Sequence, residues 1–376
     1  MMPEFLLRGT LFVSLYTQNT TFMIAAQRFP VTKIERSKLK DTPLENIPFG
    51  KYFTDYMLEA DYENGEWTNV EIKPYQPLVL HPSLAALHYG QAIFEGIKAY
   101  RLQNGDISIF RPMDNFQRFN ISAERMQMPV IPAEIFIEGM RQLIALDSNW
   151  IPDRKDHALY IRPFMFSSDE VIGVRPSETY KFLILLSPTG PYYADPMRIY
   201  VEEQYTRAAP GGVGYAKTAG NYGGSMMATA EARKKGYDQV LWTDAFEHKY
   251  VQEIGTMNVF FIIGNKACTP DLENSTILAG VTRDSAIKVL AGMGYEVEER
   301  PVNIDEICDA YKAGTLKEVF GTGTAATISM IRELKYRDFV MHFHAENWVA
   351  GPGLKKELDA IREGRVEDPY GWMLKV

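Results

Sequence analysis

The chain has 376 residues, of which 46% are hydrophobic and 23% are charged; these ordinary values exclude a disordered or fibrous protein. Its 40 Lys and Arg against 48 Asp and Glu leave a formal net charge of −8, which argues against binding to nucleic acid or to an anionic membrane surface. No stretch of 18 apolar residues predicts a membrane span. Cys268 and Cys308 form no C-x-x-C pair, so we expect a cytoplasmic protein without a disulfide framework.

The first 22 residues differ in character from the rest of the chain. Residues 6–16 resemble the apolar core of a secretory signal, but Arg8 interrupts it and no suitable cleavage site follows. A more ordinary sequence begins at Met23. We therefore expect residues 1–22 to be a disordered arm or an upstream extension from a misassigned start.

Two strong hairpin signals, Asn64-Gly65 and Asn104-Gly105, mark the first half of the chain. Pro112 is expected to open a helix that runs to about Met126, and an amphipathic helix is expected after Pro132. The apolar face of that second helix would consist of Phe136, Met140, Leu143 and Ile144. The segments predicted as strands are 52–61, 70–80, 99–101, 107–110, 159–166 and 180–186.

The breaker-rich segment 187–193 predicts a domain boundary, after which strands and helices alternate again. The predicted strands are 197–205, 239–243, 250–254, 259–263 and 317–320. Helices are expected over about 225–235, after Thr282 with an end near Gly292 or Gly294, and between Asp305 as N-cap and Gly314. This mixture predicts an α+β or α/β fold.

Three glycine-rich turns are candidate anion sites. The first, residues 211–224, carries Lys217; the second, 279–282, opens a helix; the third, 321–325, is also expected to open one. Backbone N–H groups exposed at a helix start bind anions, although a single Gly-Thr turn is often only a cap. Two such turns in one half, with a lysine flanked by glycines, favour a phosphate-bearing ligand.

Lys217 has two interpretations, a solvated loop lysine or a nucleophile in a sheltered pocket that forms a Schiff base. A phosphate-bearing aldehyde cofactor would need this lysine, anion-binding turns and an acid beside its pyridine nitrogen. Glu253, in QEIGTMN (252–258), could supply the acid, or could be a salt-bridged strand glutamate. P-loop, nucleophile-elbow and H-E-x-x-H motifs are absent, and His342 with His344 lack a third ligand, so no metal site is predicted.

A series of segments in order along the chain resembles the branched-chain amino-acid aminotransferases, pyridoxal-phosphate enzymes of class IV and fold type IV. They include LHYGQAIFEGIKAYR (87–101), FRPMDNFQR (110–118), GGVGYAKTAGNYGG (211–224), EIGTMN (253–258), LAGVTRDS (278–285) and VFGTGTAA (319–326). The resemblance implies a smaller N-terminal α/β domain at 23–187, an interdomain loop at 188–195 and a larger, barrel-like cofactor-binding domain at 196–376. It also implies a homodimer.

The resemblance implies a role for each matching residue. Lys217 is similar to the lysine that binds pyridoxal 5′-phosphate and moves the α-proton, and Glu253 to the carboxylate on the pyridine nitrogen. Tyr222 resembles the tyrosine on the cofactor's 3′ oxygen and Arg118 the arginine on its phosphate. The remaining cofactor contacts would be Thr256, Val281, Thr282 and Thr324.

Further residues would line the substrate pocket. Arg162 would meet the distal carboxylate of glutamate or 2-oxoglutarate, and the N–H groups of Thr324 and Ala325 the α-carboxylate. An apolar side chain would be enclosed by Phe49, Phe94 and Val174, with Tyr89 and Tyr160 beside it. Phe49 and Phe94 could instead be plain core residues.

The activity implied is reversible transamination of L-leucine, L-isoleucine and L-valine with 2-oxoglutarate, which gives branched-chain 2-oxo acids and L-glutamate. D-amino-acid aminotransferases and aminodeoxychorismate lyases of the same fold are alternatives with the same lysine and glutamate logic. A protein that only binds a phosphorylated metabolite, with Lys217 as a phosphate contact, is a third.

Overall fold

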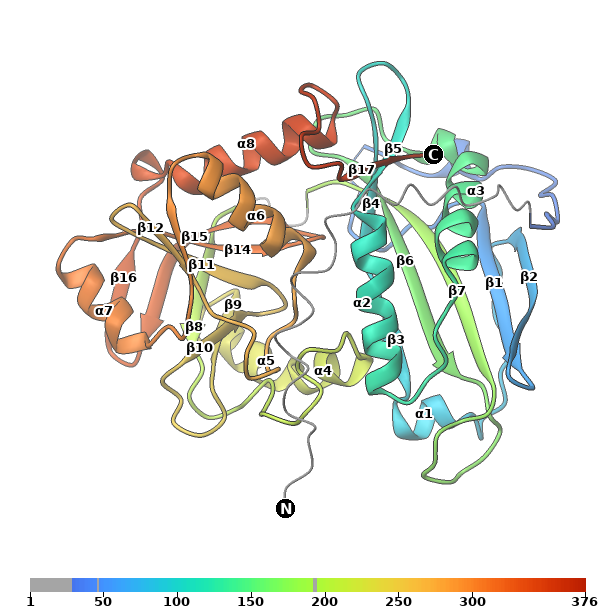
Figure 1. Ribbon diagram of the computed structural model, residues 1–376, viewed down its shortest axis with the longest axis horizontal. Helices are drawn as coiled ribbons and strands as arrows, with labels where there is room; N and C mark the ends of the chain where they lie inside the picture. Colours follow the sequence, from blue (N-terminus) through green and yellow to red (C-terminus); the bar gives the residue numbers. More distant parts are fainter. Residues whose placement is uncertain (1–28, 46, 192–194) are drawn as a thin grey trace.

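The computed structural model describes residues 29–45, 47–191 and 195–376 and contains two sheets with helices packed against them (Figure 1). One sheet, with its helices α2 and α3, forms the right half of the view, and the other forms the left half. The expectation for residues 1–22 lies outside the described residues, as does part of the loop expected at 188–195.

The first sheet has 8 strands, all paired antiparallel, in the order β17-β5-β4-β6-β7-β1-β2 with β3 added on β6. Its strands are β1 (Tyr56–Glu63), β2 (Glu66–Pro74), β3 (Ala92–Phe94), β4 (Ile97–Arg101), β5 (Ile107–Phe110), β6 (Ala158–Ser167), β7 (Tyr180–Thr189) and β17 (Met373–Lys375). Because β17 pairs with β5, the end of the chain returns to the sheet formed by its beginning.

Helices and short helical turns accompany the first sheet on both of its faces. They are α1 (Ala85–Tyr89), α2 (Pro112–Arg125), the π-helical turn η2 (Glu134–Glu138) and α3 (Gly139–Leu146), with short 3-10 turns η1 (Leu39–Asp41) and η3 (Ser148–Trp150). The predicted amphipathic face is confirmed, since Phe136, Met140, Leu143 and Ile144 are all fully buried. They pack with Phe119 of α2 in one core.

The second sheet has 9 strands in the order β10-β9-β8-β15-β14-β11-β12-β13, with β16 added on β15. These are β8 (Met197–Val201), β9 (Gln239–Thr243), β10 (Val251–Ile254), β11 (Asn258–Ile263), β12 (Lys266–Thr269), β13 (Glu296–Glu299), β14 (Leu316–Gly323), β15 (Thr327–Tyr336) and β16 (Phe339–His342). Ile254 and Met257 exchange backbone hydrogen bonds of 2.9 and 2.8 Å, which join β10 to β11. The strand order therefore closes into a ring, from β10 through β9, β8, β15 and β14 to β11 and back to β10. This is the barrel-like arrangement expected.

The helices of the second half are α4 (Ala219–Gly224), α5 (Met226–Lys234), α6 (Val281–Gly292), α7 (Ile304–Lys312) and α8 (Ala350–Arg362), with the 3-10 turn η4 (Ala345–Asn347). An apolar core under α6 and α8 includes Phe260, Phe320 and Leu354. Phe110 and Trp372, from the first sheet and the segment that leads to β17, pack into that same core. The two halves are thus joined by buried apolar contacts, and the seam between them is a fixed feature of the fold.

Two sequence expectations about the second half are wrong. The turn 321–325 opens no helix: β14 continues to Gly323, which pairs with Thr327, so the turn joins an antiparallel hairpin. The expected N-cap Asp305 lies inside α7, whose N-cap is Asn303; the Asn303 side chain accepts the Asp305 N–H at 2.8 Å. In both places the local residues permit either structure. The pairing of β14 with β15 decides at the turn, and the side chain of Asn303 decides at the start of α7.

Several predicted strands have different ends in the structure, and two of them show the physical reason. β8 stops at Val201 because the Glu202 carboxylate accepts the N–H groups of Gln204 and Tyr205, which turns the chain. β2 begins directly after Gly65 and ends at Pro74, in place of the predicted 70–80. Proline lacks the N–H that would continue the ladder.

Candidate active site

A cavity of about 480 Å³ lies at the seam between the two halves. Side chains and backbone from both sheets line it, so only the folded chain brings these segments together. The residues expected from the sequence that line this cavity are Phe49, Phe94, Arg118, Tyr160, Arg162, Lys217, Tyr222, Thr256, Val281, Thr282, Thr324 and Ala325. Glu253 lines a smaller adjoining cavity together with Lys217, Tyr222 and Thr256.

The backbone of Lys217 is anchored to the first half of the molecule. Its N–H donates to the Ser122 hydroxyl on α2 at 2.9 Å, and its carbonyl accepts the Phe94 N–H from β3 at 3.1 Å. The side chain is half-buried, and its Nζ lies 2.7 Å from the Tyr222 hydroxyl on α4. A lysine held in this way can present its amine to a bound carbonyl compound and is no freely moving loop cation.

Glu253 is buried on β10, and one of its carboxylate oxygens is already bonded. Its Oε1 accepts the Leu278 N–H at 2.9 Å and lies 3.3 Å from Nη2 of Arg207. Within the described part of the chain, its Oε2 has no hydrogen-bond partner. One oxygen therefore fixes the carboxylate, and the other stands beside the cavity that Lys217 and Tyr222 share.

The opposite wall carries backbone donors. Val281 and Thr282 are the first residues of α6, and in the part of the chain that the structure describes their N–H groups have no partner. The same holds for the N–H groups of residues 324–326 in the β14–β15 turn. Gly280 lets the backbone before α6 lie close to the Asn258 side chain, since a Cβ at position 280 would lie 2.0 Å from Oδ1 of Asn258. The wall suits an anion such as a phosphate or carboxylate.

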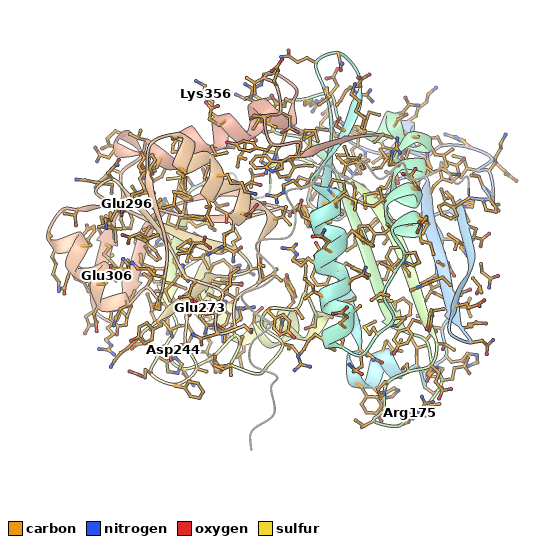
Figure 2. The ribbon with its side chains drawn as sticks, in the orientation of Figure 1. Arg175, Asp244, Glu273, Glu296, Glu306 and Lys356 are labelled. Carbon is orange, nitrogen blue, oxygen red and sulfur yellow. The ribbon has the colours of Figure 1, made fainter. Side chains whose placement is uncertain are left out.

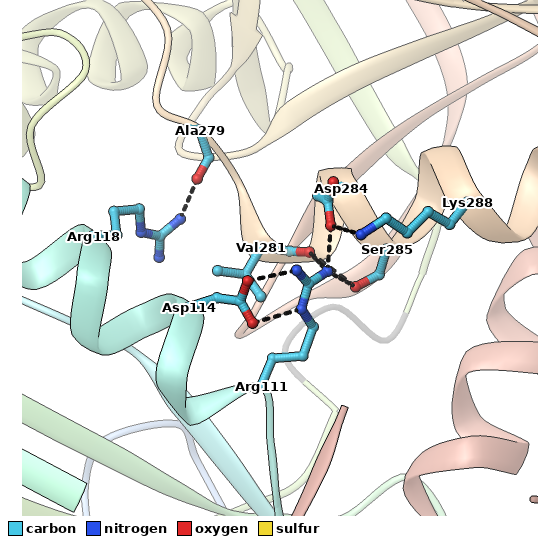
Figure 3. A network of polar contacts seen from close by, with 8 residues as sticks. All are labelled: Arg111, Asp114, Arg118, Ala279, Val281, Asp284, Ser285 and Lys288. Carbon is cyan, nitrogen blue, oxygen red and sulfur yellow. Dashed lines mark hydrogen bonds and ion pairs between the residues drawn. The ribbon is translucent and has the colours of Figure 1, made fainter. Parts of the chain in front are cut away.

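Arg118 reaches this wall, but most of its guanidinium is used by other protein groups. Nε and Nη2 donate to the two oxygens of Glu95 at 2.7 and 2.8 Å. Nη1 donates to the Ala279 carbonyl at 2.8 Å (Figure 3). Burial alone would raise the pKa of the Glu95 carboxyl, but the charge and hydrogen bonds of Arg118 hold that pKa below its ordinary value. The pair fixes Arg118 beside the loop that leads into α6.

Glu95 and Arg111, which were not predicted as site residues, position this wall. Arg111 precedes α2 and donates to Asp114 at 2.7 Å, to Asp284 of α6 at 2.6 Å and to the Ser285 hydroxyl at 2.9 Å (Figure 3). Both residues stand inside motifs noted in the sequence, FEG and FRP, which were a possible signal. The partners of Arg111 on α6 are 173 and 174 positions away, and Glu95 bonds Arg118 of α2 across 23 positions, so no local pattern revealed these contacts.

Aromatic rings and one guanidinium form the remaining wall. Phe49 and Tyr160 meet edge to face with ring centroids 4.7 Å apart, and Arg162 lies 4.5 Å from the Phe94 ring centroid. Nη2 of Arg162 donates to the Tyr160 hydroxyl at 2.7 Å, while its buried Nε has no partner among the described residues. This wall can accept an apolar side chain and still offer a donor to a carboxylate.

Tyr89 and Val174 do not line this cavity. Tyr89 ends α1 and is 42% exposed, and Val174, in the loop between β6 and β7, is 89% exposed. Figure 2 labels the neighbouring Arg175 on that loop, at the lower end of the first sheet. The fold thus leaves two expected pocket residues on its surface.

Among the described residues, no cluster of three His, Cys, Asp or Glu side chains could hold a metal ion. Within the same residues, no helix combines the length and apolar character that crossing a membrane requires.

Comparisons with known proteins agree on one family. Residues 92–334 match the family model described as amino-transferase class IV. The chain is 48% identical over 351 residues to a probable branched-chain-amino-acid aminotransferase of Staphylococcus epidermidis, covering 91% of this chain and 97% of the relative. It is 46% identical over 360 residues to branched-chain-amino-acid transaminase 1 of Bacillus subtilis, covering 91% and 99%.

Solved structures agree in fold. The branched-chain amino acid aminotransferase of Escherichia coli superposes with a TM-score of 0.70 at 28% identity, covering 85% of this chain and 98% of that one. A second solved branched-chain amino acid aminotransferase, which contains pyridoxamine 5′-phosphate, gives a TM-score of 0.68 at 26% identity, covering 84% and 97%. The chain therefore belongs to the class IV aminotransferases and, within them, to the branched-chain-amino-acid aminotransferase family.

Proposed function

We propose that this chain transfers the amino group of L-leucine, L-isoleucine or L-valine reversibly to 2-oxoglutarate, with pyridoxal 5′-phosphate as cofactor. The observation that carries the proposal is the cavity in which Lys217 and Tyr222 face a wall of backbone donors. Two relatives that are 46 and 48% identical to this chain, aligned over nearly their whole length, are named as branched-chain-amino-acid aminotransferases or transaminases.

The donor set fits this cofactor. The N–H groups at the start of α6 and in the β14–β15 turn would hold the phosphate, with Arg118, Thr256 and Thr324 beside them. The unpartnered oxygen of Glu253 would stand at the ring nitrogen, and the Tyr222 hydroxyl at the ring's 3′ oxygen. When bound, pyridoxal 5′-phosphate supplies an aldehyde that takes up the amino group and a ring that withdraws electrons from the α-carbon.

The protein's own groups would then move one proton. The amine of Lys217 would accept the proton from the substrate α-carbon and later give it back, because a lysine amine beside the substrate can serve as both base and acid. Tyr222 orients that amine through its 2.7 Å contact. Glu253 would hold a proton on the ring nitrogen of the cofactor, since a fixed carboxylate favours a positively charged partner.

One pocket must accept both leucine and glutamate. The rings of Phe49, Phe94 and Tyr160 would exclude water from an aliphatic side chain. Arg162 would bind the distal carboxylate of glutamate or 2-oxoglutarate. When leucine occupies the site, the guanidinium keeps its contacts with the Tyr160 hydroxyl and the Phe94 ring, so it is not left without partners.

We further propose a cytoplasmic homodimer. The Ala85 N–H donates to the Asp169 carbonyl at 2.8 Å, so α1 lies against the β6–β7 loop. Large apolar side chains are exposed on these two segments, namely Leu87, Tyr89, Val171, Ile172 and Val174. A second copy covering this surface would remove it from water and bring Tyr89 and Val174 to the partner's pocket. Ile172→Glu should then yield a monomer with a raised KM; an unchanged dimer by sedimentation would contradict this interface.

We also propose boundaries for two domains. We assign 23–187 to a small domain, 188–195 to the segment between domains and 196–376 to the cofactor-binding domain. The structure places Pro188 and Thr189 still in β7, and the end strand β17 reaches back to the first sheet. Limited proteolysis that cut first between residues 188 and 195 would support the boundary, and first cuts elsewhere would contradict it.

The visible absorption spectrum of the purified protein tests the activity. We expect a yellow protein whose band is replaced, on addition of L-leucine without an oxo acid, by that of the amine form. D-leucine should leave the spectrum unchanged, and a response to the D-amino acid alone would overturn the substrate. Lys217→Ala should lose all turnover while Lys234→Ala, a lysine at the end of α5, should keep it. A protein that stays colourless after incubation with pyridoxal phosphate would contradict the cofactor.

A further inference from the structure

Lys98 joins the first sheet to the β14–β15 turn across the seam. It stands on β4 opposite Tyr160 of β6, so the two side chains share one face of the sheet. Its Nζ donates to the Ala325 carbonyl at 3.0 Å, a contact between residues separated by 227 positions. Only 8% of Lys98 is exposed. A lysine is rarely buried to this extent without a carboxylate partner, so the burial of Lys98 beside a backbone carbonyl needs an explanation.

The nearby carboxylates are bound by other cations. Lys355 of α8 pairs with Asp156 at 2.5 Å and with Asp359 at 2.6 Å, and Arg362 lies 3.7 Å from Asp359. Among the described residues, the group that accepts a hydrogen bond from the Lys98 side chain is the Ala325 carbonyl. Lys98 is therefore no member of a structural ion pair, and its charge is directed at the turn.

The turn itself needs outside support. Thr327, directly after it, has a φ of 55°, a left-handed conformation that is unfavourable for a β-branched residue. The next carbonyl, that of Ala326, accepts the Ser329 hydroxyl at 3.4 Å. Lys98 and Ser329 thus hold two successive carbonyls of the turn, while the N–H groups of residues 324–326 stay without partners among the described residues beside the cavity.

We propose that Lys98 is a positioning residue for the carboxylate of the substrate: its ammonium group fixes the Ala325 carbonyl and so aims the N–H groups of the turn into the cavity. The buried positive charge also attracts a carboxylate bound at those N–H groups, because a charge acts more strongly in the protein interior than in water. This inference rests on the proposed function, since it deepens how the same cavity recognises a 2-oxo acid or amino acid.

The same contact makes the site sensitive to pH near neutrality. Burial and then the charge of Arg362 lower the pKa of Lys98 to about 7, against the opposing effects of Asp359 and Asp156 and with a further lowering by Lys355. Below pH 7 the ammonium form prevails and the carboxylate is bound well. As pH rises through 7, the charge is lost and binding weakens. Arginine in this place would stay charged and remove the dependence.

The test compares Lys98→Met, Lys98→Arg and the wild type, with Lys312→Met on the exposed surface of α7 as control. The 2-oxo acid half-reaction is measured from pH 6 to 8.5, because the carboxylate of a 2-oxo acid does not titrate there. We expect Lys98→Met to raise the KM about tenfold at pH 6.5 with kcat within about threefold. The wild-type KM should rise through pH 7, and that of Lys98→Arg should not. The inference would be overturned if Lys98→Met had the same KM as the wild type. It would also be overturned if the KM of Lys98→Arg rose with pH as that of the wild type does.

Hydrogen exchange of the amides of residues 324–328 gives a second readout that needs no turnover. Exchange should be faster in Lys98→Met than in the wild type and near the wild-type rate in Lys98→Arg and Lys312→Met. Unchanged exchange in Lys98→Met would overturn the anchoring role even if kinetics changed. A wild type without any transaminase activity would contradict the proposed function instead, and the exchange rates would still decide whether Lys98 anchors the turn.

Discussion

Arg118 and Glu95 form a buried bidentate pair, with Nε 2.7 Å from Oε1 and Nη2 2.8 Å from Oε2. Arg118 comes from α2, and Glu95 from the bend between β3 and β4, so the pair fixes the helix to the sheet. The Ala279 carbonyl accepts the remaining Nη1, which carries the connection into the second half. The anion-binding wall of the cavity is therefore built on a charge pair in the first half.

Glu95→Gln should reveal the strength of this pair. The substitution keeps the shape of the side chain but leaves the Arg118 charge buried without its counter-ion, so we expect the free energy of unfolding to fall by about 3 kcal/mol. Urea unfolding at pH 7 measures it. Asp41→Asn is the control, because Asp41 pairs with Arg36 at the surface, and its loss should cost below about 1 kcal/mol. Equal small effects in both variants would show that the buried pair contributes no more than the exposed one.

Tyr222→Phe removes the hydroxyl that lies 2.7 Å from Nζ of Lys217. We expect kcat/KM for L-leucine to fall about tenfold to a hundredfold, since a hydrogen bond that orients the amine is lost while the ring stays. Tyr205→Phe loses a 3.3 Å contact with Glu231 and should keep its activity. Wild-type kinetics in Tyr222→Phe would refute the orienting role of this hydroxyl.

Arg162→Met should separate the two kinds of substrate. The guanidinium is the cationic group on the aromatic wall, so its loss should reduce kcat/KM for L-glutamate and 2-oxoglutarate about a hundredfold. Amino exchange between L-leucine and a branched-chain 2-oxo acid needs no distal carboxylate and should change by less than about threefold. Both reactions are measured on one preparation, which makes the second the control for the first. Equal losses in both would exclude a role in substrate choice.

The stability of the fold should depend on Asp147. Burial raises the pKa of this carboxyl from 3.8 to about 6, against the hydrogen bonds from Thr54 and Tyr56. A raised pKa means that the folded chain holds the proton more tightly than the unfolded chain. The stabilisation is therefore complete below about pH 4 and is lost as pH rises to about 6. The wild type should lose about 3 kcal/mol of unfolding free energy relative to Asp147→Asn between pH 4 and 7.

Unfolding in urea at several pH values measures this difference. Asp309→Asn changes a carboxylate on α7 whose side chain is 76% exposed, and its difference from the wild type should stay level across the same range. A level difference for Asp147→Asn as well would show that its carboxyl is not protonated in the folded protein near pH 5.

Local patterns in the sequence were enough for many elements. Pro112 sets the start of α2, and the spacing of Phe136, Met140, Leu143 and Ile144 is that of a helix with one buried face. Asn64-Gly65 forms the turn between β1 and β2. These features depend on neighbours within a few residues, so they can be predicted from the sequence alone. Strands with weak local signals, such as β3 and β17, were missed because their stability comes from the strands beside them.

The residue types of the site could likewise be named in advance. A lysine among glycines, two turns rich in Gly and Thr, and an acid in a strand indicated the chemistry, and the cavity contains or adjoins all of them. The β14–β15 turn shows the limit, because Gly-Thr-Gly-Thr-Ala suits the start of a helix as well as a hairpin. Pairing of Gly323 with Thr327 decided for the hairpin.

By itself, then, the sequence indicated a lysine, an acid and glycine-rich turns for the site, and it determined the helices with a marked apolar face and the tight turns, because these follow from short-range chemistry. Only the tertiary structure decided which charges hold the site in place. Arg111 meets Asp284 across 173 positions, and Lys98 meets Ala325 across 227. Such contacts arise when two sheets close around a shared apolar core, and no local pattern encodes which distant groups that closure brings together.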